Sequence, residues 1–122
     1  MSERNLVLFV DDCIESIEAI ESYTKNIDFD FFRMDRKTYS ATLREFIVIG
    51  EAISHIPEEF KSRFPEIAWR LIKDFRNFIV HEYFGIDAEI VWDAVTKELS
   101  DLKREMKSLL ILLKSSNGSY VP

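Results

Sequence analysis

The stretch AWRLIKDFRNFIVHEY, residues 68–83, indicates a helical fold because its apolar and polar side chains separate at the period of an α-helix. At 100° per residue, with Arg76 as origin, six apolar side chains occupy a sector between about 200° and 320°. Five polar side chains lie between about 60° and 160°, with Arg76 at the edge and Tyr83 one step outside. The stretch predicts an amphipathic helix with His81 on its polar face. The predicted core-facing residues are Ala68, Leu71, Ile72, Phe75, Phe78 and Ile79, and the polar face carries Arg70, Lys73, Asp74, Asn77 and His81.

The chain before this stretch predicts two further helices. Apolar residues at three- and four-residue steps indicate one helix over residues 5–26 and a second over residues 36–56. Residues 28–35 break the periodicity and are predicted to form a loop held by aromatic side chains. Gly50 lies inside the second helix despite a cost of ~1 kcal/mol relative to alanine, which indicates that another helix approaches closely there. Glu51, beside it, is a candidate partner for a buried arginine.

Prolines and a glycine mark the boundaries of the third helix. Pro57 ends the second helix, and residues 58–64 can form one short helical turn. Pro65 suits the first position of the third helix, which then runs to about Tyr83. Gly85 is expected to end it.

A last helix completes the predicted domain. Asp87 is a plausible N-cap, and apolar positions continue from Ile90 to Leu113. The tail from about Ser115 is polar and expected to be frayed. With 122 residues the chain forms a single domain, residues 1–122. We predict an all-α bundle of four main helices plus a short helical turn, with enough apolar surface to form a dimer.

The composition agrees with this fold class and restricts the location of the protein. Hydrophobic residues make up 47% of the chain, with only three glycines and three prolines, which favours long helices over sheets. The single Cys13 cannot form an internal disulfide, no apolar run approaches the ~20 residues of a membrane span, and no signal peptide is recognisable. We expect a cytoplasmic protein without a membrane anchor.

The net charge of -6 argues against general, nonspecific binding of nucleic acid, but the charge is unevenly distributed. Residues 1–32 carry two basic and eight acidic side chains, residues 33–81 carry nine and seven, and residues 82–122 carry five and seven. Arg70, Lys73 and Arg76 repeat at three-residue steps in the basic middle. They indicate a small anion site, although a solvated helix face would carry the same charges.

Two other groups of polar residues are better explained without a site. The first helix carries five carboxylates on one face, but no histidine accompanies them, so we expect a solvated face or an electrostatic contact to a basic partner rather than a metal site. His55 has no ligand partner nearby and is expected to be structural or solvated. Glycine motifs for nucleotides and cysteine/histidine spacings for metals are absent, so no cofactor is predicted. The five carboxylates are Asp11, Asp12, Glu15, Glu18 and Glu21.

The strongest candidate for chemistry is the cluster at the end of the third helix. Asn77 and His81 are four residues apart, so the amide oxygen of Asn77 could hold one imidazole nitrogen and leave the other free for proton transfer. Arg76 remains charged at all relevant pH values and suits a phosphate. This geometry requires the helix to continue through His81.

These residues resemble the signature of the HEPN superfamily, and more closely its HepT-like branch. The pattern is arginine, a polar residue, three residues, histidine, any residue and tyrosine, which is present here as RNFIVHEY at residues 76–83. The segments IGEA (residues 49–52), PEIAWR (65–70) and HEYFGID (81–87) also resemble this branch and occur in the same order. The resemblance extends from the first helix to Trp92.

The resemblance implies a helical homodimer in which both subunits form one cleft, and a metal-independent ribonuclease acting on an RNA such as a tRNA or an mRNA. HepT-like proteins are toxins of type VII toxin–antitoxin pairs, and the partner is a small MntA-like nucleotidyltransferase. That partner can transfer AMP to the tyrosine of the motif, here Tyr83. The implied catalytic residues are Arg76 and His81, with Asn77, Lys73 and Arg70 in supporting or phosphate-binding roles.

Two other functions remain open from the sequence. In the first, the cluster binds a nucleotide or supports the dimer without catalysis, and the protein is a binding module for its partner. In the second, the cluster is structural: Arg76 pairs with Glu51 or Asp74, and His81 stabilises the helix end by ~0.3 to 1 kcal/mol when protonated. The structural alternative leaves Asn77 and Tyr83 unexplained.

Overall fold

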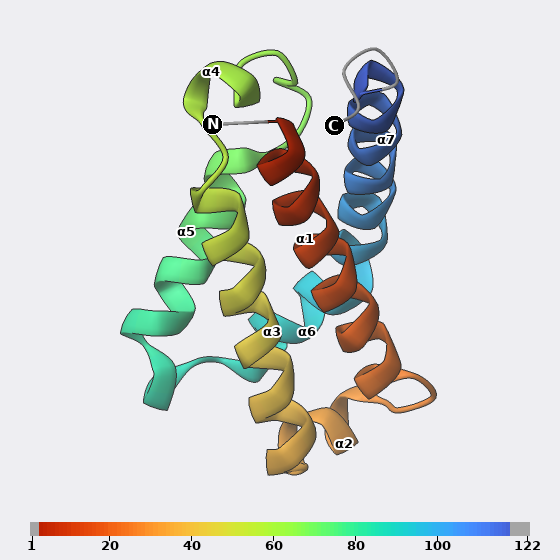
Figure 1. Cartoon of the computed structure of the whole chain (residues 1–122). Coiled ribbons are helices and arrows are strands. Elements are labelled where there is room, and N and C mark those ends of the chain that lie inside the picture. The colour runs from red at the N-terminus through yellow and green to blue at the C-terminus, as the bar shows by residue number, and fades with distance from the viewer. Residues whose placement is uncertain (1–2, 118–122) are drawn as a thin grey trace.

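A computed structural model describes residues 3–117 of the chain, which are almost entirely helical (Figure 1). Among them no strand forms, as predicted for an all-α domain. The four long helices are α1 (Glu3–Thr24), α3 (Arg36–Ser54), α5 (Trp69–His81) and α7 (Leu99–Asn117). The shorter elements are α2 (Phe29–Met34), α4 (Glu58–Lys61), the 3₁₀ turn η1 (Tyr83–Gly85), α6 (Ala88–Asp93) and the π-helical turn η2 (Ala94–Glu98).

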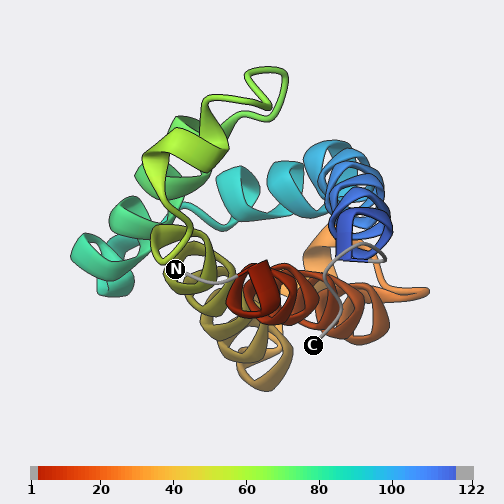
Figure 2. The same ribbon diagram turned by 45° about the horizontal axis from the view of Figure 1, so that its top comes forward.

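The long helices follow one another across the molecule. Helix α1 packs against both α3 and α7, and α5 packs on α3 (Figures 1 and 2). One continuous apolar core joins them, with α1 and α3 contributing much of it. Because α3 lies between α1 and α5, the residues of α3 that face α5 determine the surroundings of the candidate cluster.

Helix α1 has the predicted amphipathic character. Its buried side recurs at helical steps and includes Val10, Cys13 and Ile17. On its acidic side, Glu21 accepts from Lys103 at 2.7 Å, and Glu18 pairs with Lys107 at 3.5 Å. Two of the five carboxylates thus pair with lysines of the same chain, and these pairs join α1 to α7.

The prediction of a loop over residues 28–35 was wrong, because residues 29–34 form the short helix α2. The side chain of Asp28 accepts a hydrogen bond from the backbone N–H of Phe31 at 2.9 Å and caps the helix. Phe32 is fully buried and packs against Trp92 and Tyr39, with ring centroids 5.0 and 5.4 Å away. A helix of six residues is too short to show an apolar period, so tertiary packing stabilises it.

The predicted start of the third helix was also wrong. Pro65 lies in a turn, and α5 begins only at Trp69. The indole N–H of Trp69 donates to the backbone carbonyls of Lys61 and Phe64, at 3.2 and 3.1 Å, and so secures the connection from α4. The predicted short turn after Pro57 is confirmed as α4.

The last predicted helix is present but contains a wide turn. Asp87 caps α6 as predicted, accepting from the N–H of Glu89 at 2.9 Å. The π-helical turn η2 then joins α6 to α7, an irregularity that periodicity did not predict. Helix α7 continues to Asn117, so the tail predicted to fray from Ser115 is helical over residues 115–117; residues 118–122 of that tail lie outside the described residues. None of the described helices is long and apolar enough to cross a membrane.

Candidate functional site

Arg76 lies where α5 crosses α3, directly over Gly50. A Cβ atom added at Gly50 would overlap with the Cβ and Cγ atoms of Arg76. The two helices can therefore approach this closely only because residue 50 has no side chain. The close approach predicted from a glycine inside a helix is confirmed, and its partner is the stem of Arg76.

The guanidinium of Arg76 is held by two neighbours. One terminal nitrogen forms an ion pair with Glu51, as predicted, and the other donates to the side-chain oxygen of Asn77 at 2.8 Å. The Arg76 side chain is 29% exposed, and its Nε is buried without a hydrogen-bond partner among the described residues. Arg76 is thus anchored between two helices, with its side chain partly accessible.

The predicted hydrogen bond between Asn77 and His81 does not form. The amide oxygen of Asn77 is turned toward Arg76 instead, and no hydrogen bond to His81 is present in the described part of the chain. The helical spacing of four residues permits both arrangements, but the nearby guanidinium is a charged donor and makes the stronger hydrogen bond. Asn77 therefore positions Arg76 rather than the imidazole.

His81 and Tyr83 lie at the exposed end of α5. Helix α5 continues through His81, as the predicted geometry required, and His81 is exposed in its last turn. Tyr83 follows in η1, is 43% exposed, and contacts the ring of Phe84 edge-on with centroids 5.5 Å apart. Burial raises the pKa of Tyr39, and the charges of Asp87 and Tyr83 raise it further.

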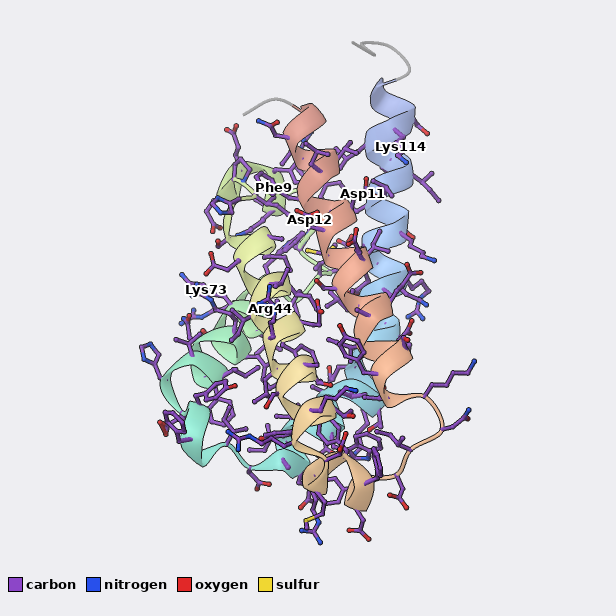
Figure 3. All side chains as sticks on the ribbon, turned by 60° about the horizontal axis from the view of Figure 1, so that its bottom comes forward. Phe9, Asp11, Asp12, Arg44, Lys73 and Lys114 are labelled. Carbon is purple, nitrogen blue, oxygen red and sulfur yellow. The ribbon has the colours of Figure 1, made fainter. Side chains whose placement is uncertain are left out.

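Arg70 and Lys73 do not join Arg76 in one pocket. Both side chains are exposed on α5; Arg70 lies 4.0 Å from Asp74, and no ion pair of Lys73 is present within residues 3–117 (Figure 3 shows Lys73). The guanidinium of Arg76 is turned toward α3, so the predicted anion site is not assembled within one copy. An electrostatic contribution of Arg70 and Lys73 to binding a larger anion stays a prediction.

The predicted core-facing sector of α5 was too wide. Ile79 is fully buried and Phe75 packs edge-on against Phe46, with ring centroids 5.0 Å apart. Leu71, however, is 69% exposed, and Ala68 is also exposed. Helix α3 covers only part of the apolar sector, so the remainder faces an open groove.

The other polar groups considered from the sequence form no site. His55 ends α3 and stacks on Phe9, with ring centroids 5.1 Å apart, which confirms a structural and solvated role. Asp11 and Asp12 project from α1 (Figure 3). In the described part of the chain, no group of three or more histidine, cysteine or acidic side chains could hold a metal ion.

Two exposed apolar residues near His81 were missed by the sequence reasoning. Val80 is 46% exposed, and Phe84 has its whole surface exposed. An apolar residue directly after the predicted end of a helix was the only available signal. With Tyr83 they form an exposed apolar surface beside His81.

The two candidate catalytic residues diverge within one copy. Five residues along a helix correspond to about 7.5 Å of rise and a rotation of about 140°. Arg76 accordingly lies against α3, whereas His81 points to solvent at the helix end. A guanidinium can bind and neutralise a phosphate, and an exposed imidazole can transfer protons near neutral pH. The chemical components of a phosphodiester-cleaving site are present, but one copy spreads them apart.

Comparison with known proteins gives a consistent result. The family model described as "Ribonuclease HepT-like" matches residues 13–109. "Probable ribonuclease HepT" of Thermococcus cleftensis is 39% identical over 101 residues, which cover 83% of this chain and 92% of that protein. "Putative RNase MJ0127" of Methanocaldococcus jannaschii is 33% identical over 110 residues, covering 90% of this chain and 91% of that protein. No solved structure matches the chain.

Proposed function

This chain belongs to the HepT-like ribonuclease family, and on that premise we propose that it is a metal-independent ribonuclease in which two copies form a composite site from Arg76 and His81. The observation that carries the proposal is the arrangement on α5: Arg76 is anchored over Gly50, and His81 is free at the helix end. The relatives are named as ribonucleases, which agrees with these side chains.

The proposed reaction begins with attack of a ribose 2′-hydroxyl on the adjacent phosphorus. His81 of one copy accepts the 2′ proton while the new O–P bond forms. The bond from phosphorus to the 5′ oxygen then breaks, and His81 of the second copy donates a proton to that leaving oxygen. Arg76 stabilises the negative charge that builds on the phosphoryl oxygens.

The divergence of Arg76 and His81 supports a site shared between copies. A second copy can supply a histidine on the opposite side of the phosphate and can double the local positive charge. Because the net charge is -6, a basic cleft of this kind would be restricted to one part of the surface. An incoming phosphate must therefore compete with Glu51 for the guanidinium of Arg76.

We further propose that the protein is the toxin of a cytoplasmic toxin–antitoxin pair and that a nucleotidyltransferase antitoxin attaches AMP to Tyr83. The tyrosine is exposed and follows His81 by two residues, so its hydroxyl is accessible to an enzyme. Attached AMP would place a phosphate and a base beside the substrate position. Protein carrying AMP on Tyr83 should therefore lose cleavage, and unchanged cleavage after complete modification would contradict this inhibition.

The ribonuclease proposal is tested with purified protein that intact mass shows to be free of AMP. Total cellular RNA is incubated in EDTA with the wild type, His81→Ala and Arg76→Ala, all purified identically. We expect cleavage by the wild type alone. Cleavage by all three proteins would identify a contaminant, whereas no cleavage by a folded, unmodified dimer would favour the binding module without catalysis.

A further inference from the structure

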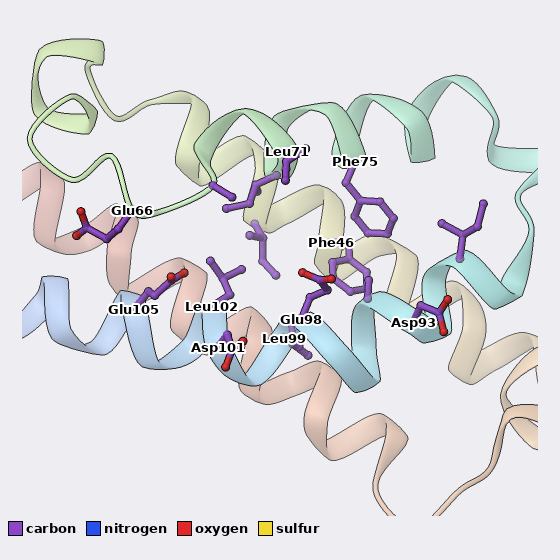
Figure 4. Close-up of a pocket in the computed structure, with 15 residues that line it drawn as sticks. Phe46, Glu66, Leu71, Phe75, Asp93, Glu98, Leu99, Asp101, Leu102 and Glu105 are labelled. Carbon is purple, nitrogen blue, oxygen red and sulfur yellow. The ribbon is translucent and has the colours of Figure 1, made fainter.

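An apolar groove lies between α5 and the α6–α7 arm, on a side of α5 that the proposed reaction does not use. Its volume is about 440 Å³. Phe46 and Ile49 of α3 contribute to its floor, and Leu71 and Phe75 of α5 line one wall, facing Leu102 of α7 (Figure 4). Exposed apolar surface of this kind usually marks a binding site.

The rim of the groove is acidic. The residues lining it include five carboxylates and no lysine, arginine or histidine. Two carboxylates are paired with cations three or four residues later in the chain, Asp93 with Lys97 at 3.3 Å and Asp101 with Arg104 at 2.8 Å. The other three, Glu66, Glu98 and Glu105, form no ion pair within residues 3–117.

Glu105 is repelled by two acidic neighbours at this rim. Partial burial raises the pKa of Glu105, and the neighbouring Asp101 and Glu66 raise it further, while Arg104 opposes them. Figure 4 shows Glu66 and Glu105 at the same end of the groove. A cationic group bound there would relieve this repulsion, whereas the phosphates of RNA would increase it.

We propose that this groove binds an amphipathic helix of a different protein, a helix with an apolar face flanked by lysine or arginine. Apolar side chains at positions i, i+3, i+4 and i+7 of that helix would contact Leu71, Phe75 and Leu102. Its basic side chains would pair with Glu66, Glu98 and Glu105. Charge complementarity selects this occupant, because the groove offers anions at the rim and apolar surface below them.

The wide turn η2 contributes to the shape of the groove. Ala94 and Glu98 lie at its two ends, and both line the groove. Turns of the π type inside helices are frequently found at functional sites. In this chain the turn joins α6 to α7 along the wall opposite α5, which is consistent with a binding role for this arm. The proposal does not depend on ribonuclease activity.

The test uses three labelled peptides of about 18 residues, or five helical turns. The first is amphipathic with leucines on one face and flanking lysines, the second has glutamates in place of the lysines, and the third is a scrambled version of the first. Binding to the full chain is measured by fluorescence anisotropy at near-physiological salt. We expect the first peptide to bind at least about tenfold more tightly than the other two.

Two groove variants locate the binding, and each has a matched control on α1. Glu66→Lys with Glu98→Lys is compared with Asp11→Lys with Asp12→Lys, because all four residues are exposed and the two pairs change the net charge equally. Leu71→Gln is compared with Leu8→Gln, since the two leucines are 69% and 54% exposed. Each groove variant should weaken binding about tenfold, and each control less than about twofold.

Three results would overturn the proposal. Absence of binding by the lysine peptide would do so, and equal weakening by groove and α1 variants would show attraction to an acidic protein in general. The third result comes from light scattering of each variant. A change of oligomeric state caused by Leu71→Gln but not by Leu8→Gln would show that the groove forms a contact between copies. Circular dichroism melts of all variants show that each is folded.

Discussion

At Gly50 the absence of a side chain lets the stem of Arg76 lie directly on the backbone of α3. This contact brings the guanidinium to Glu51 and Asn77, and it leaves the buried Nε without a partner among the described residues. One glycine thus determines both the separation of two helices and the position of the candidate phosphate-binding group.

Gly50→Ala tests this contact. Inside a helix, replacing glycine by alanine normally stabilises the fold by about 1 kcal/mol. Here the new Cβ would overlap with the near end of the Arg76 side chain, so we expect a net loss of about 1–3 kcal/mol in the free energy of unfolding. Urea denaturation gives this value. Gly85→Ala is the control: nothing lies within 4 Å of a Cβ there, and a change of less than about 0.5 kcal/mol is expected.

Arg76 and His81 should differ in their contribution to stability. Arg76→Ala removes a packed stem and an ion pair, so we expect a loss of about 1–2 kcal/mol, whereas His81→Ala, at an exposed position, should change stability by less than about 0.5 kcal/mol. Thermal and urea denaturation measure both.

Arg76→Lys separates structure from catalysis in this prediction. Lysine keeps the positive charge and most of the aliphatic part of the side chain, but it cannot form a bidentate hydrogen bond with a phosphate. We expect it to recover part of the stability lost in Arg76→Ala without recovering RNA cleavage. A stable Arg76→Lys protein with wild-type cleavage would show that the guanidinium is not required.

At the scale of the helices, Asp35 connects two elements. Its backbone N–H donates to the carbonyl of Phe31 at the end of α2. Its side chain caps α3 by accepting from the hydroxyl and the N–H of Thr38, at 2.5 and 3.2 Å. The hydrogen bond from the hydroxyl, and to a smaller extent that from the N–H, lower the pKa of Asp35 below its usual value of 3.8.

The lowered pKa of Asp35 predicts a pH-dependent contribution to stability. The charged carboxylate stabilises the fold above its ordinary pKa, and this contribution disappears as the pH falls through the lower folded value. Asp35→Asn keeps a capping oxygen that does not titrate. We expect the wild type to melt at a higher temperature than Asp35→Asn at about pH 7, and the two to converge at an acidic pH below the lowered pKa of Asp35. A difference that is equal at both pH values would contradict this.

At the scale of the whole molecule, two surfaces of this protein are unusual for an isolated domain. One is the exposed apolar surface of Val80, Tyr83 and Phe84 beside His81. The other is the acidic groove between α5 and the α6–α7 arm. The first lies where a second copy must approach if Arg76 and His81 are to form a shared site. The second carries the wrong charge for RNA and is available to a protein partner.

Phe84→Ser tests whether copies meet at the first surface. We expect the wild type to be a dimer by light scattering, and Phe84→Ser to shift toward monomer and to lose RNA cleavage to the same extent. Ile111→Ser, on α7, is the control, because Ile111 is 65% exposed and lies away from the cluster. A Phe84→Ser protein that stays dimeric and active would exclude Phe84 from the interface.

Much of the fold and part of the site followed from local sequence. Helical periodicity predicted the four long helices and the presence of His81 inside the helix, and the preference of aspartate for the first position before a helix predicted the capping role of Asp87. These features depend on neighbours within a few residues. The comparisons confirm the family that the motif resembles. Gly50 also predicted the close approach of another helix, since a glycine inside a helix is unfavourable, and Glu51 beside it was a candidate partner for a buried arginine.

The remaining features depend on which faces of the helices are covered by segments that are distant in the sequence. Residues 29–34 become helical because Phe32 is buried between other elements, and Asn77 turns to Arg76 because the guanidinium lies within its reach. Leu71 stays exposed because α3 covers only part of the apolar sector of α5. Periodicity describes the faces of a helix, but the contacts between distant segments decide which face is covered, and they determine the groove and the orientation of the candidate catalytic residues.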